Sequence, residues 1–305
     1  MPKRILITGG SGLLALNWAI ARKGVDDITL GLHQRQVQLE DVTATMISDE
    51  GDGALTEVIA DIAPDIIIHT AAMTNVDQCQ QAPDQAMQVN RDLSARVAKA
   101  AHDQGCKLVH ISTDHLFTGD EAMLDETVAC RPVNQYGESK WQGEMAVLDR
   151  HPDALILRVN FFGWGAPWRP SFSDWILSSL MDERSITLYK NAFFTPLYIK
   201  EVVQASHALL DKGLSGIFHV TSGQRISKFD FGMKLADAFD LDRALIHKGI
   251  YDGKNGIPRP LDMSLSNAKL MAVIESEPYT IDTSIARLKA DHRLKEYFSS
   301  IDNPQ

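Results

Sequence analysis

The sequence predicts a doubly wound α/β protein, in which a parallel sheet is covered by helices on both faces. Two observations lead to this fold class: short β-branched, apolar runs alternate with helix-length segments, and the first run ends in a glycine-rich turn. Strands that alternate with helices of about 10 to 15 residues are joined by right-handed crossovers, which produce a parallel sheet.

Six apolar runs have the length of buried strands: Ile5–Thr8, Ile28–Leu32, Ile66–His69, Leu108–Ser112, Leu155–Val159 and Ile217–Val220. Glycine, proline and tryptophan crowd the stretch from 163 to 170, which cannot form a regular helix. We therefore expect two parts, with the sheet formed by residues 1–160 plus about 196–221 and a smaller, discontinuous C-terminal cap formed by about 161–195 and 222–305.

The first strand leads into TGGSGLLA, and a helical pattern follows from Leu13 to Lys23. Gly10, Gly12 and Ala15 fit the spacing G-x-G-x-x-G/A, while Gly9, Gly12 and Ala15 fit a three-residue spacing. In both, glycine lets the backbone approach a diphosphate that the helix N-terminus attracts, so a Rossmann-type dinucleotide site is expected. The residues expected to bind the dinucleotide here are Gly9, Ser11, Gly12, Leu13 and Leu14. A structural turn without a ligand is the alternative.

The end of the second strand indicates which dinucleotide binds. An acid is expected there for a free ribose 2′-hydroxyl, but the sequence offers His33 and Arg35, and a cation suits a 2′-phosphate. We therefore expect NADP(H), with NAD(H) as the alternative if these two are ordinary solvated residues. Asp49, after the expected third strand, is a candidate adenine contact.

A candidate catalytic set follows the Leu108–Ser112 strand. Thr113 and Asp114 lie at its carboxyl end, where doubly wound sheets bind ligands, and Tyr136 and Lys140 are four residues apart on one face of a predicted helix. Hydride transfer to a carbonyl leaves an alkoxide, which a phenol with a pKa of about 10 protonates slowly unless a cation lowers that pKa. We expect Tyr136 to be the general acid, Lys140 to lower its pKa and hold the nicotinamide ribose, and Thr113 to orient the carbonyl. A tyrosine that only packs is the alternative reading.

Composition excludes other classes of partner. The formal charge of −10 repels nucleic acid, and no run approaches the roughly 18 apolar residues of a membrane span. The three cysteines form no CxxC pair, which favours a reducing, cytoplasmic location. His69 and His110 alternate with apolar residues and are expected in the core, so no metal is predicted. A homodimer is left open.

Three segments in register resemble the extended short-chain dehydrogenase/reductase superfamily and, within it, the dTDP-4-dehydrorhamnose reductase family. HTAAMTNVDQCQ (69–80) is similar to N-A-A-A-x-T-x-V-D, ISTDHLFTG (111–119) to I-S-T-D-Y-V-F-D-G, and YGESK (136–140) to Y-G-x-[ST]-K. The resemblance implies reduction of the keto group of a nucleotide-linked 4-keto-6-deoxy sugar. It also leaves two alternatives: an epimerase or dehydratase with bound NAD, and a non-catalytic, dinucleotide-binding regulatory subunit.

The resemblance also assigns site residues. It places Asn90 beside the cofactor as a support for the central strands, and Arg259, in PRPLDMSLSNAKL, as a clamp on the substrate diphosphate. The remaining implied dinucleotide contacts are Ala71, Ala72, Met73 and Thr74, and the implied substrate contacts are Thr113, Asp114, Asn160 and Phe161.

The chain departs from the family pattern in three places. His115 replaces a tyrosine, Thr118 replaces an aspartate, and the glycine loop reads GSGLLA. These changes leave the sugar open. Segments 169–180 and 191–197 are candidates for base and sugar contacts, and the alternative is that their aromatic residues form the core of the cap.

Overall fold

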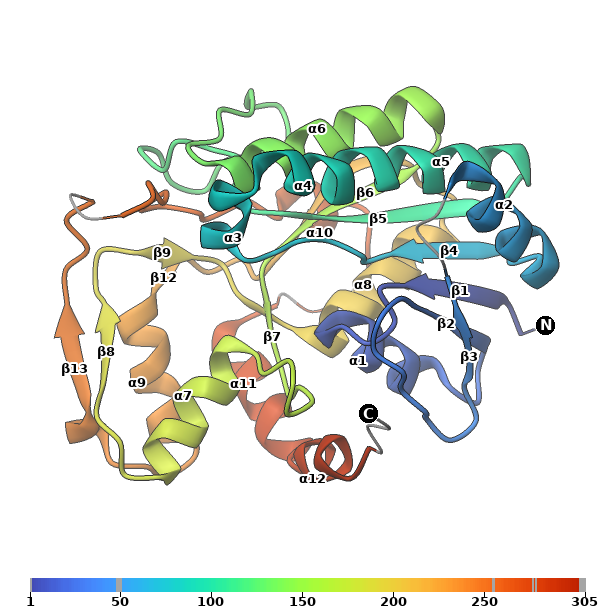
Figure 1. Ribbon diagram of the computed structural model, residues 1–305. Helices are drawn as coiled ribbons and strands as arrows, with labels where there is room; N and C mark the ends of the chain where they lie inside the picture. Colours follow the sequence, from blue (N-terminus) through green and yellow to red (C-terminus); the bar gives the residue numbers. More distant parts are fainter. Residues whose placement is uncertain (1, 48–50, 254–255, 276, 278, 302–305) are drawn as a thin grey trace.

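The computed structural model describes residues 2–47, 51–253, 256–275, 277 and 279–301. Its central feature is a seven-stranded sheet in the order β11-β6-β5-β4-β1-β2-β3, and every neighbouring pair is parallel (Figure 1). The strands are β1 (Arg4–Thr8), β2 (Asp27–Leu32), β3 (Thr43–Met46), β4 (Ile66–His69), β5 (Lys107–Thr113), β6 (Leu155–Val159) and β11 (Gly216–Val220). The predicted doubly wound fold is confirmed.

Helices cover both faces of this sheet. Figure 1 shows α2, α5 and α6 on one face and α1 with α8 on the other, and the helices of each group contact one another. The helices of this part are α1 (Leu13–Arg22), α2 (Gly51–Ile62), α3 (Val76–Gln81), α4 (Pro83–Met87), η1 (Gln88–Asp92), α5 (Leu93–Asp103), α6 (Gln135–Arg150) and α8 (Ile199–Asp211). Strand order reverses between β1 and β4, so the loops after these two strands flank a crevice at the carboxyl edge.

Most of the remaining elements gather beyond this carboxyl edge, whereas residues 268–271 pack against β11. Their short strands pair as β10 with β7, β12 with β9 and β13 with β8. The elements are β7 (Phe161–Phe162), α7 (Phe172–Met181), β8 (Ile186–Tyr189), β9 (Phe193–Phe194), β10 (Leu197–Tyr198), β12 (Ile226–Ser227), α9 (Lys228–Ala238), η2 (Arg243–Leu245), β13 (Ile246–Gly249), α10 (Ala268–Met271), α11 (Ile281–Ala290) and α12 (Arg293–Ser300).

One apolar core joins the sheet to these outer elements. Ile7 and Leu14, under the sheet, belong to the same cluster as Trp164 and Phe231 of the outer part. A smaller cluster on the opposite face, which includes Leu6, packs beneath α2, α5 and α6.

A buried ion pair fastens α6 to the sheet. The Arg158 guanidinium on β6 donates to Glu144 on α6, with Nη2 2.8 Å from Oε2 and Nε 3.0 Å from Oε1. The two side chains are only 4% and 1% exposed, so neither charge has water as a substitute partner. Removing one charge would leave the other buried and unpaired.

Replacing Glu144 with Ala should therefore lower the free energy of unfolding by about 3–5 kcal/mol, measured by urea denaturation. The double variant Glu144→Leu with Arg158→Met removes both charges and should recover most of this loss. A loss below about 1 kcal/mol in the single variant would contradict this account.

Candidate active site

The glycine loop between β1 and α1 lies against the loop that follows β4. Gly9 has a φ of +69°, and a Cβ atom there would lie 2.8 Å from the backbone N and Cα of Ala71. Gly12 is the N-cap of α1, and its Cβ would lie 3.0 Å from the Gly9 carbonyl oxygen. Only glycine allows this approach, and the start of α1 presents backbone N–H groups beside it. The cradle, which includes Ser11, Leu13 and Leu14, fits the diphosphate of a dinucleotide.

Asn90 holds the loop after β4 in place. Its side chain is fully buried, with Oδ1 accepting from the Met73 N–H at 2.8 Å and Nδ2 donating to the Met73 carbonyl at 3.0 Å. Nδ2 also donates to Ser139 Oγ on α6, at 2.9 Å. These protein groups occupy the Asn90 amide, so Asn90 positions Met73 and its neighbours Ala71, Ala72 and Thr74 rather than facing the crevice itself.

The ends of β5 and β6 bring three polar residues together. Thr113 Oγ1 lies 3.3 Å from Asp114 Oδ1, and Asn160 Nδ2 donates to Asp114 Oδ2 at 2.5 Å. Burial raises the pKa of Asp114 to about 6, although the Asn160 hydrogen bond opposes the shift. Phe161, half-buried in β7, follows directly. The carboxyl edge thus combines a hydroxyl, an amide and a carboxyl group that can bind sugar hydroxyls.

Tyr136 lies in the first turn of α6, which packs directly on the loop after β5. Asn134 caps this helix by accepting from the Gly137 N–H at 3.0 Å, and a Cβ at Gly137 would lie 2.3 Å from the His115 carbonyl oxygen. The His115 ring meets the Tyr136 ring edge-on, with centroids 5.5 Å apart. Burial raises the pKa of Tyr136, and the nearby Thr113 hydroxyl opposes this shift. The phenol is therefore protonated at neutral pH, as a proton donor must be.

Lys140, which we expect to act together with Tyr136, is buried on α6. Its ammonium donates to the Ile111 carbonyl at 2.7 Å, and its charge lowers the pKa values of His69 and His110 in the core. Burial is the main cause of the raised pKa of Tyr136, and the charge of Arg169 is among the influences that oppose this shift. Four-residue spacing places two side chains on one face of a helix, but the long lysine chain continues under β5. Burial lowers the pKa of Lys140 to about 8.

The two residues expected at the 2′-phosphate differ in exposure and in contacts. His33 is exposed, whereas Arg35 is half-buried with its Cζ 4.9 Å from the centre of the Trp168 ring. Trp168 in turn donates from Nε1 to the Ser11 carbonyl at 3.1 Å. Arg35 is therefore tied to the glycine loop through Trp168. Asp49 lies outside the described residues.

Three further cations approach the crevice. Arg259, the expected diphosphate clamp, forms an exposed ion pair with Asp77 at 3.0 Å. Lys228, the first residue of α9, lowers the pKa values of Asp114 and His115, and Arg169 donates to Thr74. Lys228 was not among the predicted site residues, and Arg169 was included only as the first residue of the candidate segment 169–180, because neither belongs to a matched motif.

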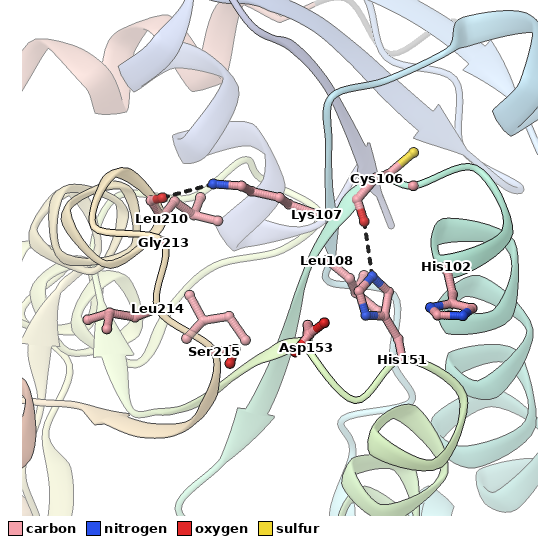
Figure 2. Close-up of a pocket in the computed structure, with 12 residues that line it drawn as sticks. His102, Cys106, Lys107, Leu108, His151, Asp153, Leu210, Gly213, Leu214 and Ser215 are labelled. Carbon is pink, nitrogen blue, oxygen red and sulfur yellow. Dashed lines mark hydrogen bonds between the residues drawn. The ribbon is translucent and has the colours of Figure 1, made fainter.

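A hollow of about 390 Å³ opens at the other end of the sheet. His151 Nε2 lies 3.0 Å from the Cys106 carbonyl oxygen. Figure 2 shows His102 beside His151, while Lys107 points the other way and donates to the Leu210 carbonyl. These residues lie at the amino ends of the strands and the carboxyl ends of the helices. Ligands of doubly wound sheets bind at the opposite edge, so the hollow is not the candidate active site.

Two core histidines stack beneath the site; His69 is hydrogen-bonded, whereas neither ring nitrogen of His110 has a hydrogen-bond partner in the described part of the chain. His69 contacts Thr8 Oγ1 at 2.7 Å and Ser94 Oγ at 3.0 Å, and its ring stacks on His110 at 5.4 Å. Burial lowers the pKa of His69 to about 3, so it is neutral. Within the described ranges, no cluster of three or more His, Cys, Asp or Glu side chains could hold a metal ion. No helix there has the length and apolar character needed to cross a membrane.

The fold and the matched segments define the class of protein. A parallel sheet in this strand order, a glycine cradle after β1, and a threonine and a Y-x-x-x-K helix at the same edge are those of an extended short-chain dehydrogenase/reductase. Residues 3–293 match the family model described as the RmlD substrate binding domain, and the chain belongs to this family. The predicted resemblance is confirmed.

Relatives and solved structures agree with this assignment. The probable low-salt glycan biosynthesis reductase Agl14 of Haloferax volcanii is 29% identical over 290 residues, covering 93% of this chain and 96% of that protein. Methionine adenosyltransferase 2 subunit beta of Danio rerio is also 29% identical, over 91% of this chain and 88% of that protein. The crystal structure of dTDP-4-dehydrorhamnose reductase from Bacillus anthracis in complex with NADP superposes with a TM-score of 0.82, at 23% identity, over 95% of this chain and 100% of that one. This last likeness shows a shared fold.

The lowered pKa of Lys140 predicts a pH dependence of stability. Its pKa is about 8 in the folded protein and 10.5 when unperturbed, so between these values the unfolded state binds more protons. The free energy of unfolding should therefore rise by up to ~3 kcal/mol between pH 8 and 10.5, relative to the Lys140→Met variant. Urea denaturation of both proteins at the two pH values tests this. An equal change in the free energy of unfolding with pH in the two proteins would contradict it.

Proposed function

We propose that this protein reduces the keto group of a nucleotide-linked 4-keto-6-deoxy sugar. The observation that carries the proposal is the convergence of Thr113, Asp114 and Tyr136 at the carboxyl edge, next to the glycine cradle. Membership of the family and the relative named as a glycan biosynthesis reductase support it.

Each site residue has a distinct task in this proposal. A reduced nicotinamide dinucleotide, when bound, supplies hydride to the carbonyl carbon. Tyr136 Oη donates its proton to the carbonyl oxygen as negative charge develops there, and the Thr113 hydroxyl orients that oxygen. Asp114 and Asn160 hold neighbouring sugar hydroxyls. Lys140 fixes the inner side of α6 to β5 and holds the nicotinamide ribose.

We propose that the dinucleotide is NADP(H), with NAD(H) as the alternative. The second strand ends without an acid that would repel a 2′-phosphate, and Arg35 lies on Trp168 beside the glycine loop. The substrate would then bind between the sheet and the cap formed by about 161–195 and 222–305, where burial lowers the pKa of His115 and the charges of Lys228 and Arg259 lower it further. Their charges suit a diphosphate.

Two other functions fit the same fold. A relative named as the beta subunit of methionine adenosyltransferase 2 favours a regulatory subunit that binds a dinucleotide and a partner enzyme. An epimerase or dehydratase with bound NAD would retain its cofactor through purification. Turnover of a keto sugar with stoichiometric consumption of the reduced dinucleotide distinguishes the proposed reductase from both.

The Tyr136→Phe variant tests the proposed reaction. Loss of the general acid should lower kcat by roughly 10²- to 10⁴-fold in an assay with dTDP-4-dehydrorhamnose and NADPH, with NADPH affinity unchanged. Tyr189→Phe is the matched control, because Tyr189 is 40% exposed on β8 and should behave as wild type.

Two outcomes would contradict the proposal. Activity of Tyr136→Phe within a few-fold of wild type would remove Tyr136 from the chemistry. Wild-type protein that binds NADPH but consumes none with any nucleotide-linked keto sugar would favour the regulatory subunit.

A further inference from the structure

One loop, residues 163–171, connects the two sides of the crevice. At its tip, Trp168 Nε1 donates to the Ser11 carbonyl of the glycine loop at 3.1 Å. The next residue, Arg169, donates from Nη2 to Thr74 Oγ1 at 2.7 Å, in the loop after β4. Neighbouring side chains of this loop thus reach both segments between which a dinucleotide lies in this class of fold.

The base of this loop is fixed, so only the side chains at its tip are free to change partners. Gly165 donates to Asp174 Oδ2 at 2.8 Å, and the Trp164 carbonyl accepts from Asn17 Nδ2 on α1 at 2.9 Å. A Cβ at Gly165 would lie 2.4 Å from the Arg169 carbonyl and 2.9 Å from Leu13 Cδ1. The backbone of Arg169 is therefore held close to the start of α1.

The present partner of Arg169 is a weak one for a guanidinium. Arg169 is exposed, and within the described part of the chain it has no carboxylate at ion-pair distance, in contrast to Arg259 with Asp77. Its bond to a neutral hydroxyl uses one of five N–H donors. Bonds to a charged oxygen are about twice as strong, and a phosphate accepts two of them from one guanidinium.

The direction of its charge agrees with a position inside the crevice. Burial raises the pKa of Tyr136, and the charge of Arg169 opposes this shift, so its guanidinium acts on the catalytic side of the site and not only on solvent. On the other side of the loop tip, Arg35 lies against the Trp168 ring at 4.9 Å. Trp168 thus contacts Arg35, the residue expected at the 2′-phosphate, while the neighbouring Arg169 bonds to the loop after β4.

We propose that Arg169 binds the diphosphate of the dinucleotide, exchanging the Thr74 hydroxyl for phosphate oxygens while Trp168 anchors the loop on Ser11. The proposal rests on the dinucleotide site of the proposed function, but not on the identity of the sugar. A nucleotide-sugar substrate also carries a diphosphate, and the contact of Trp168 with the glycine loop favours the cofactor.

The Arg169→Met variant tests this assignment by binding rather than turnover. Its Kd for NADPH, measured from the change in NADPH fluorescence, should rise roughly 10- to 100-fold, as expected for lost bonds to a charged group. Arg169→Lys should lose less, because it keeps the charge without the fork. Arg184→Met is the matched control, since Arg184 forms only an exposed pair with Asp182 and should leave the Kd unchanged.

Two further measurements are needed. The first distinguishes the cofactor diphosphate from the substrate diphosphate, and the second tests the role of Trp168. The affinity for dTDP alone, measured by calorimetry, should be the same in Arg169→Met and wild type. Addition of NADPH should change the intrinsic tryptophan emission of wild type, and Trp168→Phe should lose most of that change.

The outcomes that overturn the proposal are distinct. Wild-type NADPH affinity in Arg169→Met removes Arg169 from the cofactor site, and a loss for dTDP alone assigns it to the substrate diphosphate instead. Absence of NADPH binding in the wild type also overturns it. A protein that reduces no keto sugar, yet loses NADPH affinity in Arg169→Met, would refute the proposed function and leave this assignment standing.

Discussion

The geometry of the crevice depends on one buried amide. Asn90 bonds both the N–H and the carbonyl of Met73 and also reaches Ser139, whose hydroxyl donates to the Tyr136 carbonyl at 2.9 Å. The loop that faces the dinucleotide and the helix that carries the proposed acid are thus connected through a single side chain. Because the amide is fully buried, solvent cannot replace these bonds, and the two elements keep a fixed relation.

Sequence patterns predicted the elements that are buried or that need glycine. The six apolar runs became sheet strands with ends within one residue of those expected, because a strand covered on both faces must be apolar throughout. The close contact of Gly9 with Ala71 explains why the glycine turn was recognisable. The edge strand β3 has a weaker signal, since its residues are largely exposed, and it was expected only as a strand without bounds before Asp49.

These sequence patterns could not predict which side chains contact one another across the fold. Helical spacing predicts that Lys140 and Tyr136 share one face of α6, but it cannot predict that the Lys140 ammonium donates to the Ile111 carbonyl of β5. Arg169 and Lys228 come from segments far along the chain that fold back over the crevice, and no local spacing marks them. The stacking of Arg35 on Trp168 likewise joins residues more than 130 positions apart. The chain has a net charge of −10, yet its positively charged side chains lie where anionic ligands are expected to bind.

The shared apolar core has a consequence for motion. Trp164 and Phe231, from the outer elements, lie in one continuous cluster with Leu14 of α1 and with side chains of the sheet. Opening the crevice by swinging the outer elements away as a rigid body would expose part of that cluster to water, at about 25 cal/mol for each Å² of apolar surface. Ligands must therefore enter and leave through rearrangement of loop tips and side chains, and the rate of exchange is set by local contacts rather than by a hinge.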